Sequence, residues 1–167
     1  GWYLVAPPLT AKGEDQAKKL HENIKDEVGE VELVIVSPLM RAMQTALGGF
    51  DGCAVPFYVT PLLRERLGAP CDEGRPKKEL VKLIPEMAGW GGFKEMPEEW
   101  WCKKFVESDF NDRIDKLLSF IASRPEQTIA VVGHGGLFTR ILGVHLKNCG
   151  YTWVDFKRPA SDDVEMV

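Results

Sequence analysis

The stretch LVIVSPLMR, residues 33–41, decides the fold. Its first four residues are aliphatic without interruption, which is typical of a strand that is buried on both faces in a parallel sheet. Ser37 and Pro38 then predict the start of a helix, with Ser37 as its N-cap and Pro38 in its first position. A buried strand that leads directly into a helix favours an α/β domain with a mostly parallel sheet.

The same pattern returns near the end of the chain. Thr128–Gly133 (TIAVVG) predicts a second apolar strand, and His134-Gly135-Gly136 leads from it into a helix of about Leu137–Leu146. The remaining expected elements are a helix from Thr10 to about Val28, a strand at Cys53–Thr60, a helix near Lys77–Ile84, an amphipathic helix from Ser108 or Asp109 to before Pro125, and a last strand at Trp153–Phe156. Because Pro56 cannot donate a ladder hydrogen bond, its strand is expected at an edge of the sheet or in an irregular place.

The composition is that of one ordinary globular domain. The chain has 167 residues, of which 44% are hydrophobic and 28% are charged, so we expect a single domain over residues 1–167. The alternation of helices and strands predicts a three-layer α/β/α sandwich. Residues 61–106 form a long excursion between core elements, and we expect this excursion to cover a substrate.

Charge and cysteine content exclude several classes of function. The 21 basic and 25 acidic residues give a net charge of −4, so we expect no nucleic-acid partner. No apolar run approaches the roughly 20 residues of a membrane span, so no membrane partner is expected either. The four cysteines are scattered without a C-x-x-C pair, which favours free thiols in the cytoplasm and argues against a zinc site. We expect no metal and no cofactor.

The candidate site follows from the direction of the strands. If the two apolar strands are parallel, Arg41 and His134 lie at the same edge of the sheet, where helix N-termini can bind an anion. A structural explanation competes at each position: His134 could be a buried, hydrogen-bonded core residue, and Glu65, between Arg64 and Arg66, could be a solvated salt-bridge partner.

Four motifs in order resemble the histidine phosphatase superfamily, the phosphoglycerate-mutase-like proteins. The four segments are LTAKGEDQA at 9–17, SPLMRAMQTA at 37–46, LRE at 63–65 and VVGHGG at 131–136. Each is weak alone, but together, in the right order and spread over Leu9–Gly136, they are strong evidence for the family. The resemblance implies the three-layer fold, hydrolysis of phosphomonoesters through a phosphohistidine, and a phosphorylated small molecule or phosphoprotein as substrate.

The resemblance also implies a role for each site residue. Arg41 would bind the phosphate oxygens, together with Ser37 and Gly135. His134 would stabilise the transferring phosphoryl group. Glu65 would protonate the leaving oxygen, which requires a site that raises its pKa against the two flanking arginines.

The chain departs from the family in one respect, because the Arg-His-Gly motif that carries the nucleophile is absent. Either the chain begins after the first strand, as we expect, or Trp2–Val5 is that strand and Ala6-Pro7 stands where Arg-His should be. The second interpretation would make the protein an inactive phospho-ligand binding or scaffold protein. A mutase is a third possibility. The sequence does not indicate the oligomeric state.

Overall fold

Three parallel strands form the sheet at the centre of the protein. In the computed structural model, which describes residues 7–157, they are β1 (Leu33–Val36), β2 (Phe57–Val59) and β3 (Ile129–Val132), in the order β2-β1-β3. Val36 pairs with Val59 of β2 and with Val132 of β3, and both pairings are parallel. The C-terminal ends of all three strands therefore lie at one edge of the sheet.

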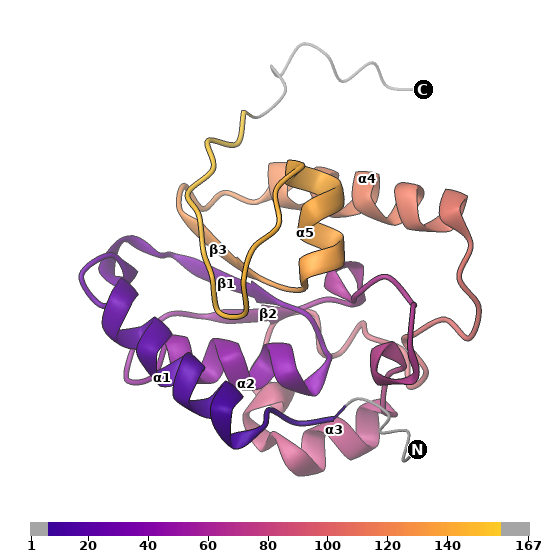
Figure 1. Ribbon diagram of the computed structural model, residues 1–167, viewed down its shortest axis with the longest axis horizontal. Coiled ribbons are helices and arrows are strands. Elements are labelled where there is room, and N and C mark those ends of the chain that lie inside the picture. The colour runs from indigo at the N-terminus through magenta and orange to yellow at the C-terminus, as the bar shows by residue number, and fades with distance from the viewer. Residues whose placement is uncertain (1–6, 158–167) are drawn as a thin grey trace.

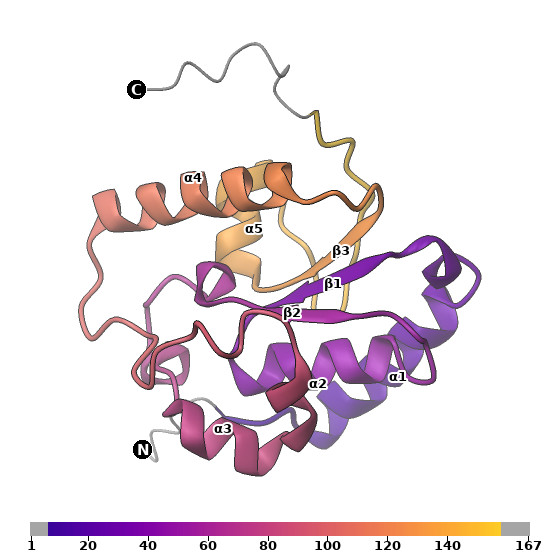
Figure 2. The ribbon, with the colours of Figure 1, turned by 180° about the vertical axis from the view of Figure 1, so that it is seen from behind.

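Helices cover both faces of this sheet (Figure 1; Figure 2). The first layer holds α1 (Ala11–Ile24), α2 (Met40–Gly49) and α3 (Lys77–Leu83), and the second holds α4 (Glu107–Ser123) and α5 (Gly135–Leu142). Short 3-10 helices lie between them: η1 (Val28–Glu30), η2 (Pro61–Leu63), η3 (Pro70–Asp72) and η4 (Pro85–Gly89). The predicted three-layer α/β fold with a parallel sheet is confirmed.

β1 divides the core between the two helical layers. All four of its residues are buried, as the uninterrupted aliphatic run predicts. Val34 and Val36 pack into the cluster formed with α1, α2 and α3, whereas Leu33 and Ile35 pack into the cluster formed with α4 and α5. The alternation of side chains along a strand produces this division.

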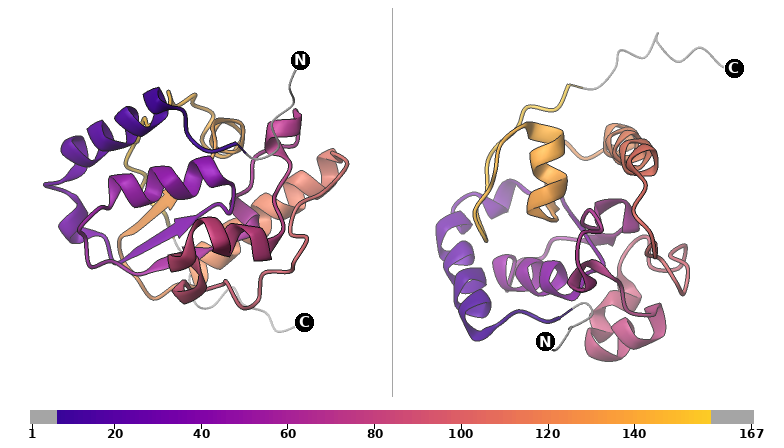
Figure 3. Two further views of the ribbon diagram at one scale, coloured as in Figure 1. Left: turned by 90° about the horizontal axis from the view of Figure 1, so that it is seen from below. Right: turned by 45° about the vertical axis from the view of Figure 1, so that its right-hand side comes forward.

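The first helix forms where its capping and periodicity predict. The Oγ1 atom of Thr10 accepts the N–H of Gly13 at 3.2 Å and so caps α1. Ala17, Leu20 and Ile24 are buried and lie near Gly48 and Gly49 of α2. The two helices run side by side (Figure 3). The helix ends at Ile24, earlier than expected.

β2 is shorter than the expected strand, but it lies at an edge of the sheet, as the proline at position 56 predicts. It covers three residues. The carbonyl of Pro56 accepts the N–H of Val34 at 3.0 Å, so the proline joins the ladder as an acceptor only. Gly91 forms an isolated bridge with Tyr58 on the other side of β2.

Two predictions about helix ends are wrong. Ser37 does not cap α2, and Pro38 does not occupy its first position, because Leu39 is the N-cap and the helix begins at Met40. The Ser37 side chain instead contacts His134, which is the N-cap of α5. The helix after β3 ends at Leu142, where Gly143 adopts a left-handed conformation (φ 70°), so His145 lies outside it.

The expected last strand at Trp153–Phe156 is also wrong, because this segment is irregular. Trp153 and Val154 are 59% and 55% exposed, and Phe156 is 43% exposed. No backbone hydrogen bond among the described residues joins 151–157 to a strand. The segment is instead held by side chains, since the indole of Trp153 and the hydroxyl of Tyr151 donate to Glu27.

The alternative first strand at Trp2–Val5 lies outside the described residues. Within residues 7–157, no helix combines the length and apolar character needed to cross a membrane.

Candidate functional site

The predicted site residues all follow the C-terminal ends of the three strands. Ser37 comes directly after β1, and Arg41 lies in the first turn of α2. Glu65 follows η2, the turn after β2. His134 is the N-cap of α5 and comes two residues after β3. Since the strands are parallel, the topology brings these residues to one edge of the sheet.

Ser37 and His134 contact each other in the interior. The Nε2 atom of His134 lies 2.8 Å from the Oγ atom of Ser37. The same Oγ also accepts the backbone N–H of Leu39 at 3.3 Å. Ser37 is 0% exposed and His134 is 6% exposed. This contact explains why Ser37 is not the cap of α2, because its hydroxyl links the ends of β1 and β3.

Burial and nearby cations keep His134 neutral. Burial is the larger cause, and the charges of Arg41 and Arg113 add to it, so the pKa of His134 lies well below its ordinary value of 6.5. All three effects disfavour the imidazolium form. An anion placed among these groups would oppose the effect of the two arginines.

Arg41 is held in place by the loop that contains η3. Its Nη1 donates to the carbonyl oxygen of Cys71 at 2.7 Å, and its Nη2 donates to Oδ1 of Asp72 at 2.9 Å. The Oδ2 atom of Asp72 accepts the N–H groups of Gly68 and Ala69. A guanidinium has five N–H donors, so these contacts leave others for a ligand.

Glu65 lies against the N-terminus of α5. Its Oε2 accepts the N–H of Gly136 and its Oε1 accepts the N–H of Leu137, both at 3.0 Å. Oε1 also accepts the N–H of Arg66 at 2.8 Å. The carboxylate thus satisfies first-turn donors of the helix that His134 caps, and its charge is favourable at a helix N-terminus. The structural alternative of a solvated Glu65 salt bridge is wrong, since no ion pair among the described residues includes Glu65.

The approach of Glu65 explains the glycine at position 136. A Cβ atom there would lie 2.6 Å from the Oε1 atom of Glu65. A Cβ atom on the neighbouring Gly135 would meet only an ordinary van der Waals contact, with the His145 ring at 3.9 Å. The two glycines of the predicted motif therefore have different surroundings, and only Gly136 requires the absence of a side chain for this contact.

Asp72 and Arg113 also lie at this edge, and no motif in the sequence assigns either of them a role. Asp72 stands in a polar loop whose path no local pattern predicts. Arg113 lies on the buried face of α4, where its charge interrupts an apolar stripe. A buried arginine in an amphipathic helix is the signal that could have drawn attention to it.

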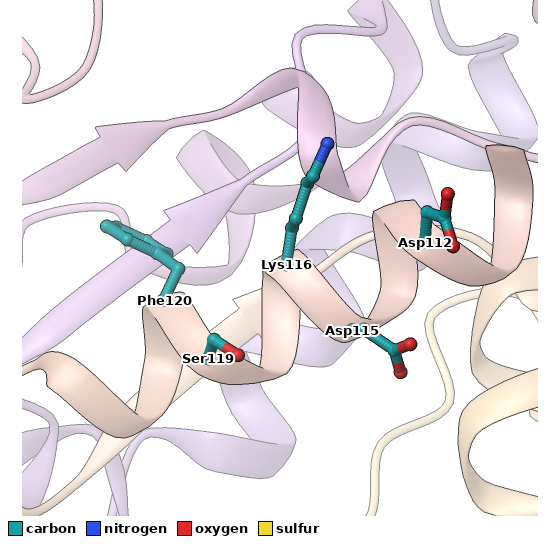
Figure 4. Close-up of a pocket in the computed structure, with 5 residues that line it drawn as sticks. All are labelled: Asp112, Asp115, Lys116, Ser119 and Phe120. Atoms are coloured by element: carbon teal, nitrogen blue, oxygen red, sulfur yellow. The ribbon is translucent and has the colours of Figure 1, made fainter. Parts of the chain in front are cut away.

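An open hollow lies along α4. Figure 4 shows the side chains that line it: Asp112, Asp115, Lys116, Ser119 and Phe120. They all come from one helix, and none belongs to the predicted site. Within residues 7–157, no group of three His, Cys, Asp or Glu side chains could hold a metal ion.

Comparison with known proteins agrees with this arrangement. The model of the histidine phosphatase superfamily (branch 1) matches residues 5–159. A probable phosphatase of Schizosaccharomyces pombe is 32% identical over 136 residues, which cover 77% of this chain and 62% of the relative. A phosphoglycerate mutase-like protein of Arabidopsis thaliana is 28% identical over 174 residues, which cover 84% and 64% of the two chains. The chain thus spans less than two thirds of the length of these curated relatives.

A solved structure shares the fold. The alpha-ribazole phosphatase of Shigella flexneri superposes with a TM-score of 0.57 at 24% identity, over 86% of this chain and 72% of that chain. The family match covers nearly all of the 167 residues and contains the whole candidate site. This chain belongs to the histidine phosphatase superfamily.

Proposed function

We propose that the protein hydrolyses phosphomonoesters through a phosphohistidine intermediate. One observation carries the proposal: Ser37, Arg41, Glu65 and His134 follow three parallel strands and meet at one edge of the sheet. That edge combines a guanidinium, a neutral buried imidazole and a helix N-terminus. These are the groups that position a phosphate and neutralise its charge.

In this proposal, Arg41 holds the phosphate through the N–H groups that Asp72 and Cys71 leave unused. His134 donates to the transferring phosphoryl group, supported by the hydroxyl of Ser37 at 2.8 Å. The Gly135 backbone N–H, at the first position of α5, adds a further donor.

Glu65 is the proposed general acid, a role that requires its carboxyl group to be protonated when substrate is bound, whereas in the structure the group accepts three backbone N–H groups. A histidine nucleophile attacks phosphorus, the bond from phosphorus to the ester oxygen breaks, and Glu65 delivers a proton to that oxygen. Water then attacks the phosphohistidine and gives its proton to Glu65, which releases orthophosphate and restores the acid. The reaction requires an Arg-His-Gly histidine, and the 167 residues of this chain contain no such motif.

The proposed substrate is a phosphorylated small molecule or a phosphoprotein, with the 61–106 excursion over the site. The Shigella neighbour, an alpha-ribazole phosphatase by name, is consistent with a small phosphorylated substrate. The cytoplasm is the proposed compartment, because the four cysteines are free thiols.

The test uses the complete gene product that contains this chain. Incubation with a ³²P-labelled phosphomonoester should give an acid-labile phosphoenzyme, and p-nitrophenyl phosphate should be hydrolysed. His134→Ala should reduce both by at least about 100-fold. Absence of label together with absence of hydrolysis would contradict the proposal.

A second candidate is a non-catalytic phospho-ligand binding protein, which would use Arg41 and His134 of the candidate site without a nucleophile. It would bind inorganic phosphate in a titration that depends on Arg41, without turnover. A third is a mutase, in line with the name of the Arabidopsis relative. A mutase would move the phosphoryl group between two hydroxyls instead of releasing it to water.

A further inference from the structure

Arg113 on α4 is a buried cation whose hydrogen bonds within residues 7–157 all go to backbone carbonyls. The residue is 7% exposed. Its Nη1 donates to the carbonyl oxygens of Leu62 at 2.8 Å and of Arg64 at 2.6 Å. Its Nη2 donates to the carbonyl oxygen of Glu65 at 3.4 Å. The guanidinium also lies over the ring of Phe110, 4.9 Å from its centroid.

This placement is unfavourable for a charge unless its hydrogen bonds are well placed. Burial and the nearby charge of Arg64 lower the pKa of Arg113 to about 10, so the side chain remains charged at neutral pH. No carboxylate within residues 7–157 forms an ion pair with Arg113. Because an apolar side chain often fills a buried site at no loss of stability, packing alone does not require an arginine here.

The three carbonyls share one segment, which ends at Glu65. Leu63 in this segment is fully buried in the cluster around α4 and α5. The 62–65 segment is therefore held in two ways: Arg113 binds its backbone carbonyls, and the buried Leu63 side chain packs into the core. The Glu65 carboxylate at the end of this segment reaches Gly136 and Leu137 of α5.

The direction in which Glu65 leaves the backbone thus depends on the guanidinium. Arg113 lies 48 to 51 residues away in sequence from the carbonyls that it binds, so the contact ties α4 to the loop after β2. If this contact were removed, the loop carbonyls would lose their donors and Glu65 would lose its fixed starting point.

We propose that Arg113 is a positioning residue for Glu65, which holds the loop so that the carboxylate faces the reacting ester oxygen. This inference rests on the proposed function, in which Glu65 protonates the leaving group. Arg113 itself does not touch the substrate in this proposal.

The test compares two substrates that differ in their need for an acid. The leaving group of p-nitrophenyl phosphate, p-nitrophenolate, departs readily without a proton. The leaving group of glycerol 2-phosphate is an alkoxide of glycerol, which does not depart readily unless it is protonated. The value of kcat/KM is measured on both for the complete gene product and for Glu65→Gln, Arg113→Met and Arg113→Lys. The control is Arg140→Met, because Arg140 is an exposed arginine that binds Asn111 outside the site.

Glu65→Gln should lower kcat/KM on glycerol 2-phosphate by about 100-fold or more, with a much smaller loss on p-nitrophenyl phosphate. Arg113→Met should follow it, with a loss of about 10- to 100-fold on glycerol 2-phosphate and at most a few-fold on the aryl ester. Arg113→Lys, which keeps a donor, should recover part of the loss. The Arg140→Met control should match the wild type on both substrates.

Arg113→Lys combined with Glu65→Gln keeps the test decisive if the methionine variant does not fold. If Arg113 acts through Glu65, the lysine substitution should have no further effect on glycerol 2-phosphate hydrolysis in the Glu65→Gln background. Multiplicative losses in that background would overturn the proposal. Equal losses on both substrates for the single Arg113 variants would overturn it as well, since a structural role affects both alike.

Failure of the proposed function has a different signature. A wild-type protein that hydrolyses neither ester would contradict the phosphatase assignment. An equal loss on both substrates for Glu65→Gln would remove the acid role of Glu65 and, with it, the positioning role of Arg113. A leaving-group effect in Glu65→Gln that Arg113→Met lacks would overturn the positioning role alone.

Discussion

Asp72 and Arg41 form an ion pair at the candidate phosphate site. Oδ1 of Asp72 accepts from Nη2 of Arg41 at 2.9 Å, while Oδ2 accepts the N–H groups of Gly68 and Ala69. The Cys71 carbonyl binds the second nitrogen of the same guanidinium. The Arg41 guanidinium therefore already donates to the Cys71 carbonyl and to Asp72. Only an arginine has enough N–H donors to keep both contacts and also bind a phosphate.

Arg41→Lys tests this division of donors. Lysine keeps the charge but has a single nitrogen, so it cannot bind Asp72, the Cys71 carbonyl and a bidentate phosphate together. We expect inorganic phosphate to inhibit the variant of the complete gene product about tenfold more weakly, which corresponds to about 1.4 kcal/mol. An unchanged inhibition constant would contradict a phosphate-binding role. Arg140→Lys provides the matched control.

The buried imidazole of His134 predicts a pH dependence of stability. Its pKa is lowered in the folded protein from 6.5, so below about pH 6.5 the unfolded chain binds a proton that the folded chain does not. Stability from this group is fully present above pH 6.5 and falls as the pH decreases, by up to about 1.4 kcal/mol per pH unit. When the free energy of unfolding is measured in urea between pH 7.5 and 5, it should fall less steeply with decreasing pH in His134→Gln than in the wild type. If the free energy of unfolding changes equally with pH in the wild type and in His134→Gln, His134 is not a buried neutral histidine.

Gly136→Ala tests the contact between Glu65 and α5. The new Cβ would displace the Glu65 carboxylate, which costs the variant two hydrogen bonds. In the matched Gly135→Ala variant, the Cβ makes only an ordinary van der Waals contact with the His145 ring. We expect Gly136→Ala to be less stable than Gly135→Ala by about 1–2 kcal/mol in urea unfolding. In a Glu65→Ala background, this difference should disappear. Its persistence there would mean that another contact is responsible.

The 167-residue chain should lack turnover by itself. Without an Arg-His-Gly histidine, the remaining groups can bind a phosphate but cannot accept a phosphoryl group. Release of p-nitrophenol from p-nitrophenyl phosphate by the purified chain should stay at the level of the buffer. Turnover that is lost in His134→Ala would show instead that His134 or a partner replaces the expected nucleophile.

The same chain should self-associate. Among the strands of residues 7–157, β3 lies at an edge of the sheet, and it is wholly apolar yet only half-buried. Trp153 and Val154 are exposed. An apolar edge strand with exposed apolar neighbours favours pairing between copies. Light scattering should show a mass that increases with concentration, and Trp153→Ser with Val154→Ser should reduce it. Leu83→Ser, which removes a 54% exposed leucine of α3, should have little effect.

Local patterns predicted the parts of the fold that local interactions decide. The aliphatic run of β1 and the periodicity of α1 depend on neighbouring residues, and both were confirmed. The placement of Arg41 and His134 at one edge followed from strand direction alone. By contrast, Ser37 was assigned to the cap of α2 because its actual partner, His134, is 97 residues away.

Contacts between distant segments account for the rest of the site. Glu65 was singled out by its motif, but its position on α5 depends on residues 71 and 72 positions further along the chain. No spacing rule connects Arg113 to the loop that it binds. The sequence at Trp153–Phe156 has strand propensity, yet the segment has no strand partner among the described residues, and propensity alone does not form a sheet.

The alternating side chains of β1 have a consequence for how the protein unfolds. Because Val34 and Val36 serve one helical layer while Leu33 and Ile35 serve the other, neither layer can melt without uncovering half of the central strand. The two layers therefore belong to one cooperative unit, and the amide hydrogens of β1 should exchange with solvent only through global opening. The candidate site, anchored at the end of this strand through Ser37, should persist until the whole domain unfolds.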